Sequence, residues 1–87
     1  MLEMVRLAII GAAAEAGLGF RVMPPIPQIA CFVQVFRPEA PEKVSHVLIS
    51  ASEIESADDA KIYDIGMQRI TNMQRVFAGG YPLSQAA

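Results

Sequence analysis

Cysteine and histidine are nearly absent from this chain. Each occurs once in 87 residues, as Cys31 and His46. A single cysteine cannot form an internal disulfide, which is typical of a reducing compartment, and we expect a cytoplasmic protein. One cysteine and one histidine are also too few for a zinc site, which normally has four ligands. We therefore expect no metal and no cofactor.

Positive charge is also scarce. The chain has 7 basic and 9 acidic residues, for a net charge of −2, and the basic residues are spread singly along it. A surface that follows the phosphates of a duplex needs several Lys or Arg side chains on one face. Nucleic acid is therefore not an expected partner.

No apolar run is long enough to cross a membrane. Glu15 interrupts the first run well short of the roughly 20 residues that a spanning helix needs. The same segment imitates a signal peptide, with Arg6, an apolar run over residues 7–14 and a small-residue triplet at 14–16. Because Glu3 cancels the charge of Arg6, a signal peptide is the weaker interpretation.

A complete nucleotide-binding loop is missing as well. The segment LAIIGAAAEAGLGF (7–20) ends in glycines, but Gly-x-Gly-x-x-Gly started at Gly11 finds alanine at both later positions. Started at Gly17, its third position is Val22, and the prolines that follow prevent the helix that would hold a phosphate. A single buried helix is the better interpretation of this segment, and a nucleotide site the weaker one.

Apolar residues, in contrast, are abundant, and 53% of the chain is hydrophobic. A domain this small buries only about 60% of the surface of its unfolded chain, so it has little interior in which to place them. Exposed apolar surface on a small protein most simply indicates contact with another subunit, usually a symmetry-related copy. We expect a homo-oligomer, most simply a dimer.

The first predicted element is a helix over residues 2–16, which are rich in Ala and Leu and contain few polar side chains. We expect it to be buried nearly all round. Ala8, Ala12 and Ala16 recur at every fourth position and form a strip of small residues that another helix can approach closely. Gly17 is placed to end the helix in a left-handed conformation.

Two β-strands are predicted next, over residues 28–37 and 44–54, because both segments are rich in β-branched and aromatic residues. The polar loop PEAPEK (38–43) joins them into a hairpin, and the proline-rich segment 23–27 before them is a stiff connector. Apolar residues fall on both faces of the first strand, so we expect both faces to be covered, one of them by a partner.

A second helix is predicted from near Ala57, where Ser56 and Asp59 resemble a capping box, to the pair Gly79 and Gly80. Its apolar residues fall on one face of a helical wheel. The residues after it have no such periodicity.

The expected fold is a small single α+β domain over residues 1–87, with residues 81–87 as a loosely ordered tail. Its order is helix, strand, strand, helix, which forms an antiparallel hairpin packed by two helices. Two strands are too few to be stable alone, so we expect dimerisation to complete the fold.

Arg69 is the most unusual residue, because helical geometry places it inside the apolar face of the last helix. Either its guanidinium binds an anion or a subunit through paired hydrogen bonds, or its stem lies on the core and its head reaches water or an acid. Glu15 is the corresponding acid in the first apolar helix. We hypothesise that Glu15 and Arg69 form an ion pair, within a chain or between two chains.

Cys31 and His46 make a catalytic dyad only within hydrogen-bond reach. A hairpin closed by the six-residue loop pairs Arg37 with Val44 and places His46 opposite Val35. That position is four residues from Cys31, or about 13 Å. A dyad is therefore disfavoured.

Two functions are compatible with these features. The first is a non-enzymatic binding or assembly module that acts as a homo-oligomer and contacts a copy of itself, another protein or a small apolar ligand. Its candidate interface residues are Ala8, Ala12, Ala16 and Arg69.

The alternative is a small enzyme whose pocket, formed between subunits, binds an anionic or apolar small molecule. In that case Arg69 holds the anion, and Glu15 or His46 transfers protons. The first function is favoured, because no nucleophile, metal set or cofactor loop is complete.

Overall fold

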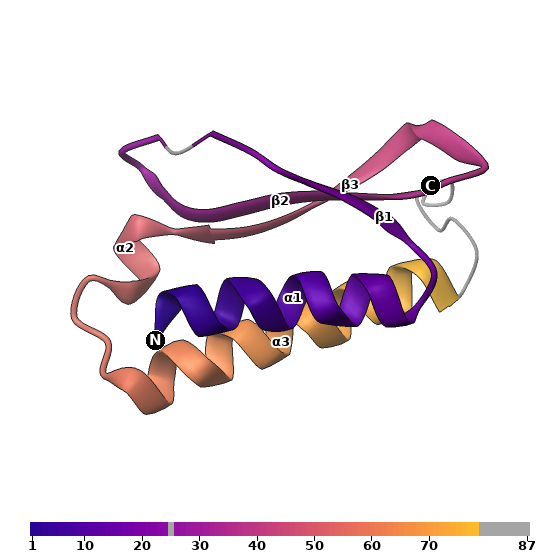
Figure 1. Cartoon of the computed structure of the whole chain (residues 1–87). Helices are drawn as coiled ribbons and strands as arrows, with labels where there is room; N and C mark the ends of the chain where they lie inside the picture. The colour runs from indigo at the N-terminus through magenta and orange to yellow at the C-terminus, as the bar shows by residue number, and fades with distance from the viewer. Residues whose placement is uncertain (25, 79–87) are drawn as a thin grey trace.

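The computed structural model describes residues 1–24 and 26–78 and shows a small α+β fold (Figure 1). Its elements are α1 (Leu2–Glu15), β1 (Gly19–Val22), β2 (Ile29–Arg37), β3 (Ala40–Ser50), α2 (Ala51–Ile54) and α3 (Asp59–Ala78). The predicted fold class is confirmed, but the order of elements adds β1 and the short α2. The predicted glycine stop and the tail after it lie outside the described residues, and dimerisation stays a prediction.

The three strands form one antiparallel sheet in the order β1-β2-β3, and α1 and α3 pack side by side on one face of it (Figure 1). In β2, the side chains beneath the helices are fully buried: Cys31, Val33 and Val35. The alternate side chains point to the open face and are only half-buried: Phe32, Gln34 and Phe36. Within the described chain, helices thus cover one of the two faces that were expected to be covered.

The prediction that α1 is buried nearly all round is wrong. Only one row of its side chains, spaced four residues apart, is buried: Val5, Ile9 and Ala13. Met4 and Leu7 are 66% and 59% exposed. One sheet and one neighbouring helix contact only one side of a helix, so the remaining apolar side chains of α1 lie on the surface.

The predicted left-handed end of α1 is confirmed. Gly17 has a φ of 75°, and its amide donates to the carbonyl of Ala14 at 3.0 Å. The amide of Leu18 donates to the carbonyl of Ala13 at 2.9 Å, which completes a Schellman motif. This turn directs the chain into β1, a four-residue strand that the sequence did not predict.

The turn between β2 and β3 is tighter than the predicted six-residue loop. Arg37 pairs with Ala40, so only two residues separate the strands, whereas Phe36 pairs with Val44. The irregularity between these two pairs inserts extra residues into β3. The predicted pairing of Arg37 with Val44 is therefore wrong, because Val44 pairs with Phe36, one residue earlier in β2.

The predicted second strand ends earlier than expected, at Ser50. There the Glu53 carboxylate accepts hydrogen bonds from the Ser50 amide, at 2.9 Å, and from the Ser50 hydroxyl, at 3.1 Å. This capping arrangement starts α2. The last helix, α3, begins later than expected, at Asp59, and its first turn is capped by Asp58, whose carboxylate accepts from the Lys61 amide at 2.9 Å. The predicted cap pair of Ser56 and Asp59 is therefore wrong.

The predicted apolar face of α3 is confirmed, since its central residues are buried: Ile65, Gly66, Ile70, Met73 and Phe77. Near the end of α3, the Arg37 guanidinium of β2 donates to the carbonyl of Phe77. A cation at this position satisfies a terminal carbonyl of the helix and interacts favourably with the helix dipole. The C-terminal end of α3 is thus tied to β2 by a polar contact.

Candidate functional site

Arg69 lies on α3 beside the edge strand β3, and its side chain is 22% exposed. Its Nε donates to the carbonyl of Leu48 at 2.9 Å, and its Nη1 donates to the Gln68 side chain at 2.8 Å. Its Nη2 forms an ion pair with Glu53. The predicted ion pair of Arg69 with Glu15 within one chain is therefore wrong, and such a pair between two chains stays a prediction.

These contacts explain how a charged side chain fits in an apolar helix face. Because β3 is an edge strand, it leaves the Leu48 carbonyl free to accept from Arg69. The stem lies over the core, and the guanidinium reaches the carboxylate on α2. Arg69 therefore joins α3 to β3 and α2 within the chain.

Glu53 is the other half of this contact. The Ser50 amide holds the pKa of the Glu53 carboxyl below its ordinary value, and Arg69 adds to this effect. A carboxylate that accepts these hydrogen bonds is stabilised in its charged form. The charged pair thus belongs to the folded state at neutral pH.

His46 lies on the open face of the sheet, opposite Gln34. The predicted pairing of His46 with Val35 is wrong. The irregularity near the turn shifts the register by one residue, so the His46 side chain points to the open face and not to the helix face. Gln34 contacts the imidazole with its Nε2, 3.2 Å from Nε2 of His46, and accepts from Nη1 of Arg21 at 3.1 Å. The ring centroids of Phe32 and His46 are 5.3 Å apart.

Cys31 lies on the opposite face of the sheet from His46, since it pairs with Ile49 beneath the helices. No Cys-His dyad is formed. Burial raises the pKa of the Cys31 thiol, so the thiolate is disfavoured. In the described parts of the chain, no group of three or more His, Cys, Asp or Glu side chains is arranged to hold a metal ion.

A shallow hollow of about 190 Å³ beside β3 is lined by both Arg69 and His46. Glu15, at the end of α1, does not line it. The structure therefore brings together two of the three residues of the alternative enzyme site. The three nitrogens of the Arg69 guanidinium, however, each donate a hydrogen bond inside the chain.

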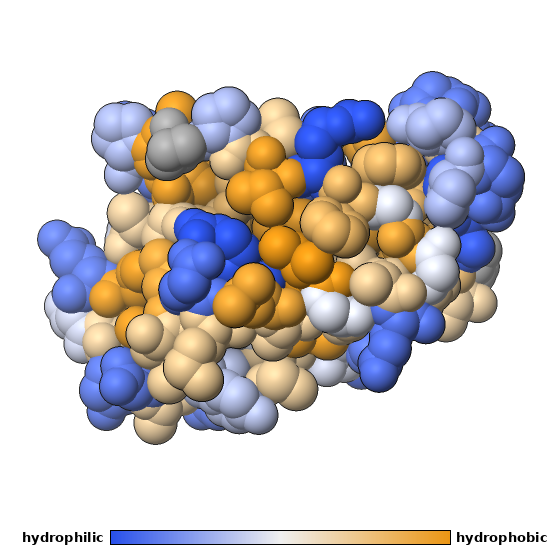
Figure 2. Space-filling model, viewed as in Figure 1, coloured by the Kyte–Doolittle hydropathy of each residue, from blue (hydrophilic) through white to orange (hydrophobic). Residues whose placement is uncertain are grey.

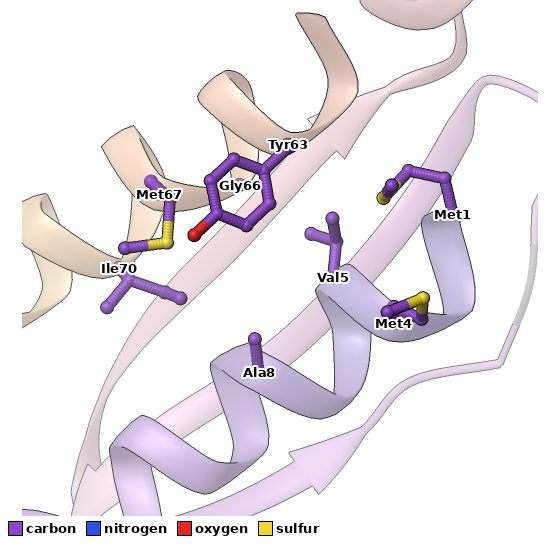
Figure 3. A pocket seen from close by; sticks show the side chains of 8 residues that line it. All are labelled: Met1, Met4, Val5, Ala8, Tyr63, Gly66, Met67 and Ile70. Carbon is purple, nitrogen blue, oxygen red and sulfur yellow. The ribbon is translucent and has the colours of Figure 1, made fainter. Parts of the chain in front are cut away.

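A groove runs between α1 and α3 on the side that faces away from the sheet, and apolar side chains line it almost completely (Figure 3). Met1, Met4 and Ala8 come from α1 and its preceding residue, and Tyr63 and Met67 come from α3. All five side chains are exposed, among them Met4 at 66%, Tyr63 at 53% and Met67 at 41%. We call this surface the helix groove.

Close contact between the two helices forms the floor of the helix groove. Gly66 faces Val5, and a Cβ added at Gly66 would lie 2.6 Å from a Val5 methyl group. With Ala8 on α1, these small side chains leave a depression of about 170 Å³ between the larger methionines. The floor is therefore a packed helix contact, and its rim consists of exposed methionine and tyrosine.

The predicted alanine strip lies along α3 of the same chain. Ala8 lines the helix groove with Tyr63 and Met67, Ala12 is half-buried against the core, and Ala16 lines a hollow with Gln74 and Phe77. Contact of these alanines with a second copy stays a prediction. The sequence analysis did not identify Met4 and Met67 as surface residues. For Met67 a signal was present, because Tyr63 and Met67 are four residues apart and lie outside the apolar stripe of α3.

Comparison with protein-family models, with curated proteins and with solved structures gave no match. None of the helices in residues 1–24 and 26–78 combines the length and the apolar character needed to cross a bilayer. The proposed function therefore rests on the surfaces described above.

Proposed function

We propose that this protein is a non-enzymatic assembly module that acts as a homo-oligomer, and that two copies meet through the helix groove. The observation that carries this proposal is the exposed Met4, Tyr63 and Met67 rim around an almost wholly apolar groove. Methionine side chains are flexible and polarisable, which suits them to a contact surface. A two-fold contact would bring the same apolar patch of both copies together.

The size of the helix groove favours a protein contact over a small ligand. Its volume of about 170 Å³ is below the roughly 300 to 1,000 Å³ of most small-molecule pockets. Its surface is instead continuous with exposed side chains on two helices, which a second pair of helices can cover. Burying these side chains would also account for part of the apolar excess of the composition.

The alternative, a small enzyme with a pocket for an anionic small molecule, draws its support from the hollow that Arg69 and His46 share. The closed contacts of Arg69 with Glu53 and Leu48 favour a structural role for this arginine instead. The assembly function is therefore our conclusion.

The test is the solution mass by light scattering over a dilution series, for the wild type and for two variants, Met4→Glu and Met67→Glu. Each variant places a charge in the apolar contact and is expected to weaken the dimer by at least about tenfold. Asn72→Glu is the matched control, because Asn72 is an exposed residue of α3 that does not line the helix groove. It is expected to leave the mass unchanged.

A wild type that stays monomeric at every concentration would contradict the proposal. So would variants at Met4 and Met67 that dissociate at the same concentration as the wild type. Circular dichroism of each variant checks that the fold is retained.

A further inference from the structure

In the part of the chain that the structure describes, strand β1 has a free edge. It is the first strand of the sheet, and no strand among the described residues pairs with its outer side. The amide of Met23 donates to the carbonyl of Phe32 at 3.0 Å, so Met23 belongs to a hydrogen-bonded pair. Hydrogen-bonded pairs alternate along an antiparallel ladder. The N–H and C=O groups of Phe20 and Val22 therefore point away from β2, where another strand can bind them.

No element among the described residues covers the side chains at this edge. Phe20 pairs with Val35 and Val22 with Val33, so both point to the face that carries the helices. Val33 and Val35 are fully buried, whereas Phe20 and Val22 are 41% and 48% exposed. Apolar side chains gather over α1 and β1 on this side of the molecule (Figure 2). An added strand would place its own side chains on these two.

Positive charge accompanies the apolar surface. Between Phe20 and Val22, the side chain of Arg21 points to the open face with Gln34, and it makes no salt bridge with any described residue. At the end of β1, a cavity of about 230 Å³ is lined by Val22 and by Arg6 of α1. The Arg6 guanidinium forms an ion pair with Glu3 through its Nη1, so the positive charge that an acidic partner would meet at this edge is that of Arg21. An acidic partner therefore fits this edge.

A second copy of the chain fits the edge poorly. In a continuous sheet, paired residues point to the same face, and the exposed backbone groups of Phe20 would pair with those of Val22 of the partner subunit. This register places Arg21 directly opposite Arg21 of the partner subunit, and like charges opposite each other destabilise a sheet. Shifting the register by two residues brings into the pairing either the buried Leu18 or Pro24, which has no N–H; both lie outside β1.

We propose that the free edge of β1 binds an extended segment of another protein as a fourth strand, and that this segment has an acidic residue between two apolar residues. The acid lies opposite Arg21 on the open face, and the apolar residues lie against Phe20 and Val22 on the helix face. Backbone hydrogen bonds supply affinity, and Arg21 selects the acid. This surface is separate from the helix groove, so the inference goes beyond the proposed function.

The test uses two capped seven-residue peptides as probes, Ser-Thr-Val-Glu-Val-Thr-Ser and the same peptide with Lys in place of Glu. They are titrated into ¹⁵N-labelled protein while the backbone amides are followed by NMR. The Glu peptide is expected to shift the amides of Phe20 and Val22 most, and to bind about fivefold more tightly than the Lys peptide. In Arg21→Glu the preference is expected to reverse.

A pair of variants at one position tests the backbone contact. Val22→Pro removes an outward N–H that the sheet itself does not use, and edge strands tolerate proline at such positions. It is expected to abolish binding of both peptides, whereas Val22→Thr, which keeps the N–H, retains binding. Met67→Glu, in the helix groove, is expected to bind the Glu peptide normally, which keeps this test independent of self-association.

Three results would overturn the inference. The first is that neither peptide shifts the Phe20 and Val22 amides at millimolar concentration. The second is that Val22→Pro binds as well as Val22→Thr. The third is that the Glu peptide has no advantage over the Lys peptide, or that Arg21→Glu keeps the wild-type preference.

Discussion

At the scale of single residues, the ion pair between Glu53 and Arg69 determines how stability should depend on pH. The Ser50 amide and Arg69 lower the pKa of Glu53 in the folded protein relative to the unfolded chain. Its contribution to stability is therefore complete above the pKa of an unfolded glutamate, about 4.3, and is lost as the pH falls through the lower folded-state pKa. Glu53→Gln is expected to cost about 1 kcal/mol at neutral pH, because the ion pair is partly exposed.

Urea denaturation at a series of pH values measures this effect. The difference in unfolding free energy between wild type and Glu53→Gln is expected to shrink as the pH falls below about 4. Glu55→Gln is the control, since Glu55 is exposed and makes no ion pair in the described structure. A difference between wild type and Glu53→Gln that is constant across this range would show that the charge of Glu53 does not stabilise the fold.

Arg69 also shows what a helical wheel can predict about a residue. The 3.6-residue period correctly placed Arg69 at the apolar face of α3 and indicated that it needs a partner. The partner was not predictable, because Glu53 is available only if β3 ends at Ser50 and α2 follows. Sequence spacing within one helix does not contain that tertiary information.

At the scale of elements, the contact of α1 with α3 depends on a glycine. In Gly66→Ala the new Cβ would lie 2.6 Å from the stiff, buried side chain of Val5. The resulting overpacking outweighs the gain in helix propensity, so we expect a net loss of about 1 to 2 kcal/mol in unfolding free energy. Urea denaturation of this variant measures the loss.

Two comparisons separate packing from propensity. Gly11→Ala changes a glycine of α1 with no atoms within 4 Å of the added Cβ, and it is expected to stabilise by up to about 1 kcal/mol. In a Val5→Ala background, Gly66→Ala is expected to be neutral or stabilising. If Gly66→Ala stabilises the wild type as much as Gly11→Ala does, the close contact at Gly66 is not a constraint.

Among the features of the helices and strands, the strand register was predicted least well from the sequence. Gly17 ended α1 as predicted, because a left-handed cap has a local signature. The pairing of β2 with β3, in contrast, depends on an irregularity beside Arg37 that no residue type signals. Because of that one shift, His46 lies on the open face and not on the helix face, and the neighbours predicted for this histidine are wrong.

At the scale of the whole molecule, apolar residues in excess of what the core holds lie in two exposed surfaces, the helix groove and the free edge of β1. The fold class followed from the periodicity of the segments, but β1 did not, because four residues between a glycine cap and prolines are too short to show a pattern. The location of the exposed surfaces was not predictable either, since it depends on which sides of α1 and β1 the other elements leave uncovered.

The most direct test of the account is an isotope-filtered NOE experiment on a mixed sample, in which one copy has ¹³C-labelled methionine methyl groups and the other is unlabelled. The proposed contact through the helix groove predicts NOEs from the Met4 and Met67 methyl groups of the labelled copy to Tyr63 and Ala8 of the unlabelled one. A sample that is dimeric by mass but shows no such NOEs at Met4 and Met67 would contradict it, as would a monomer at every concentration.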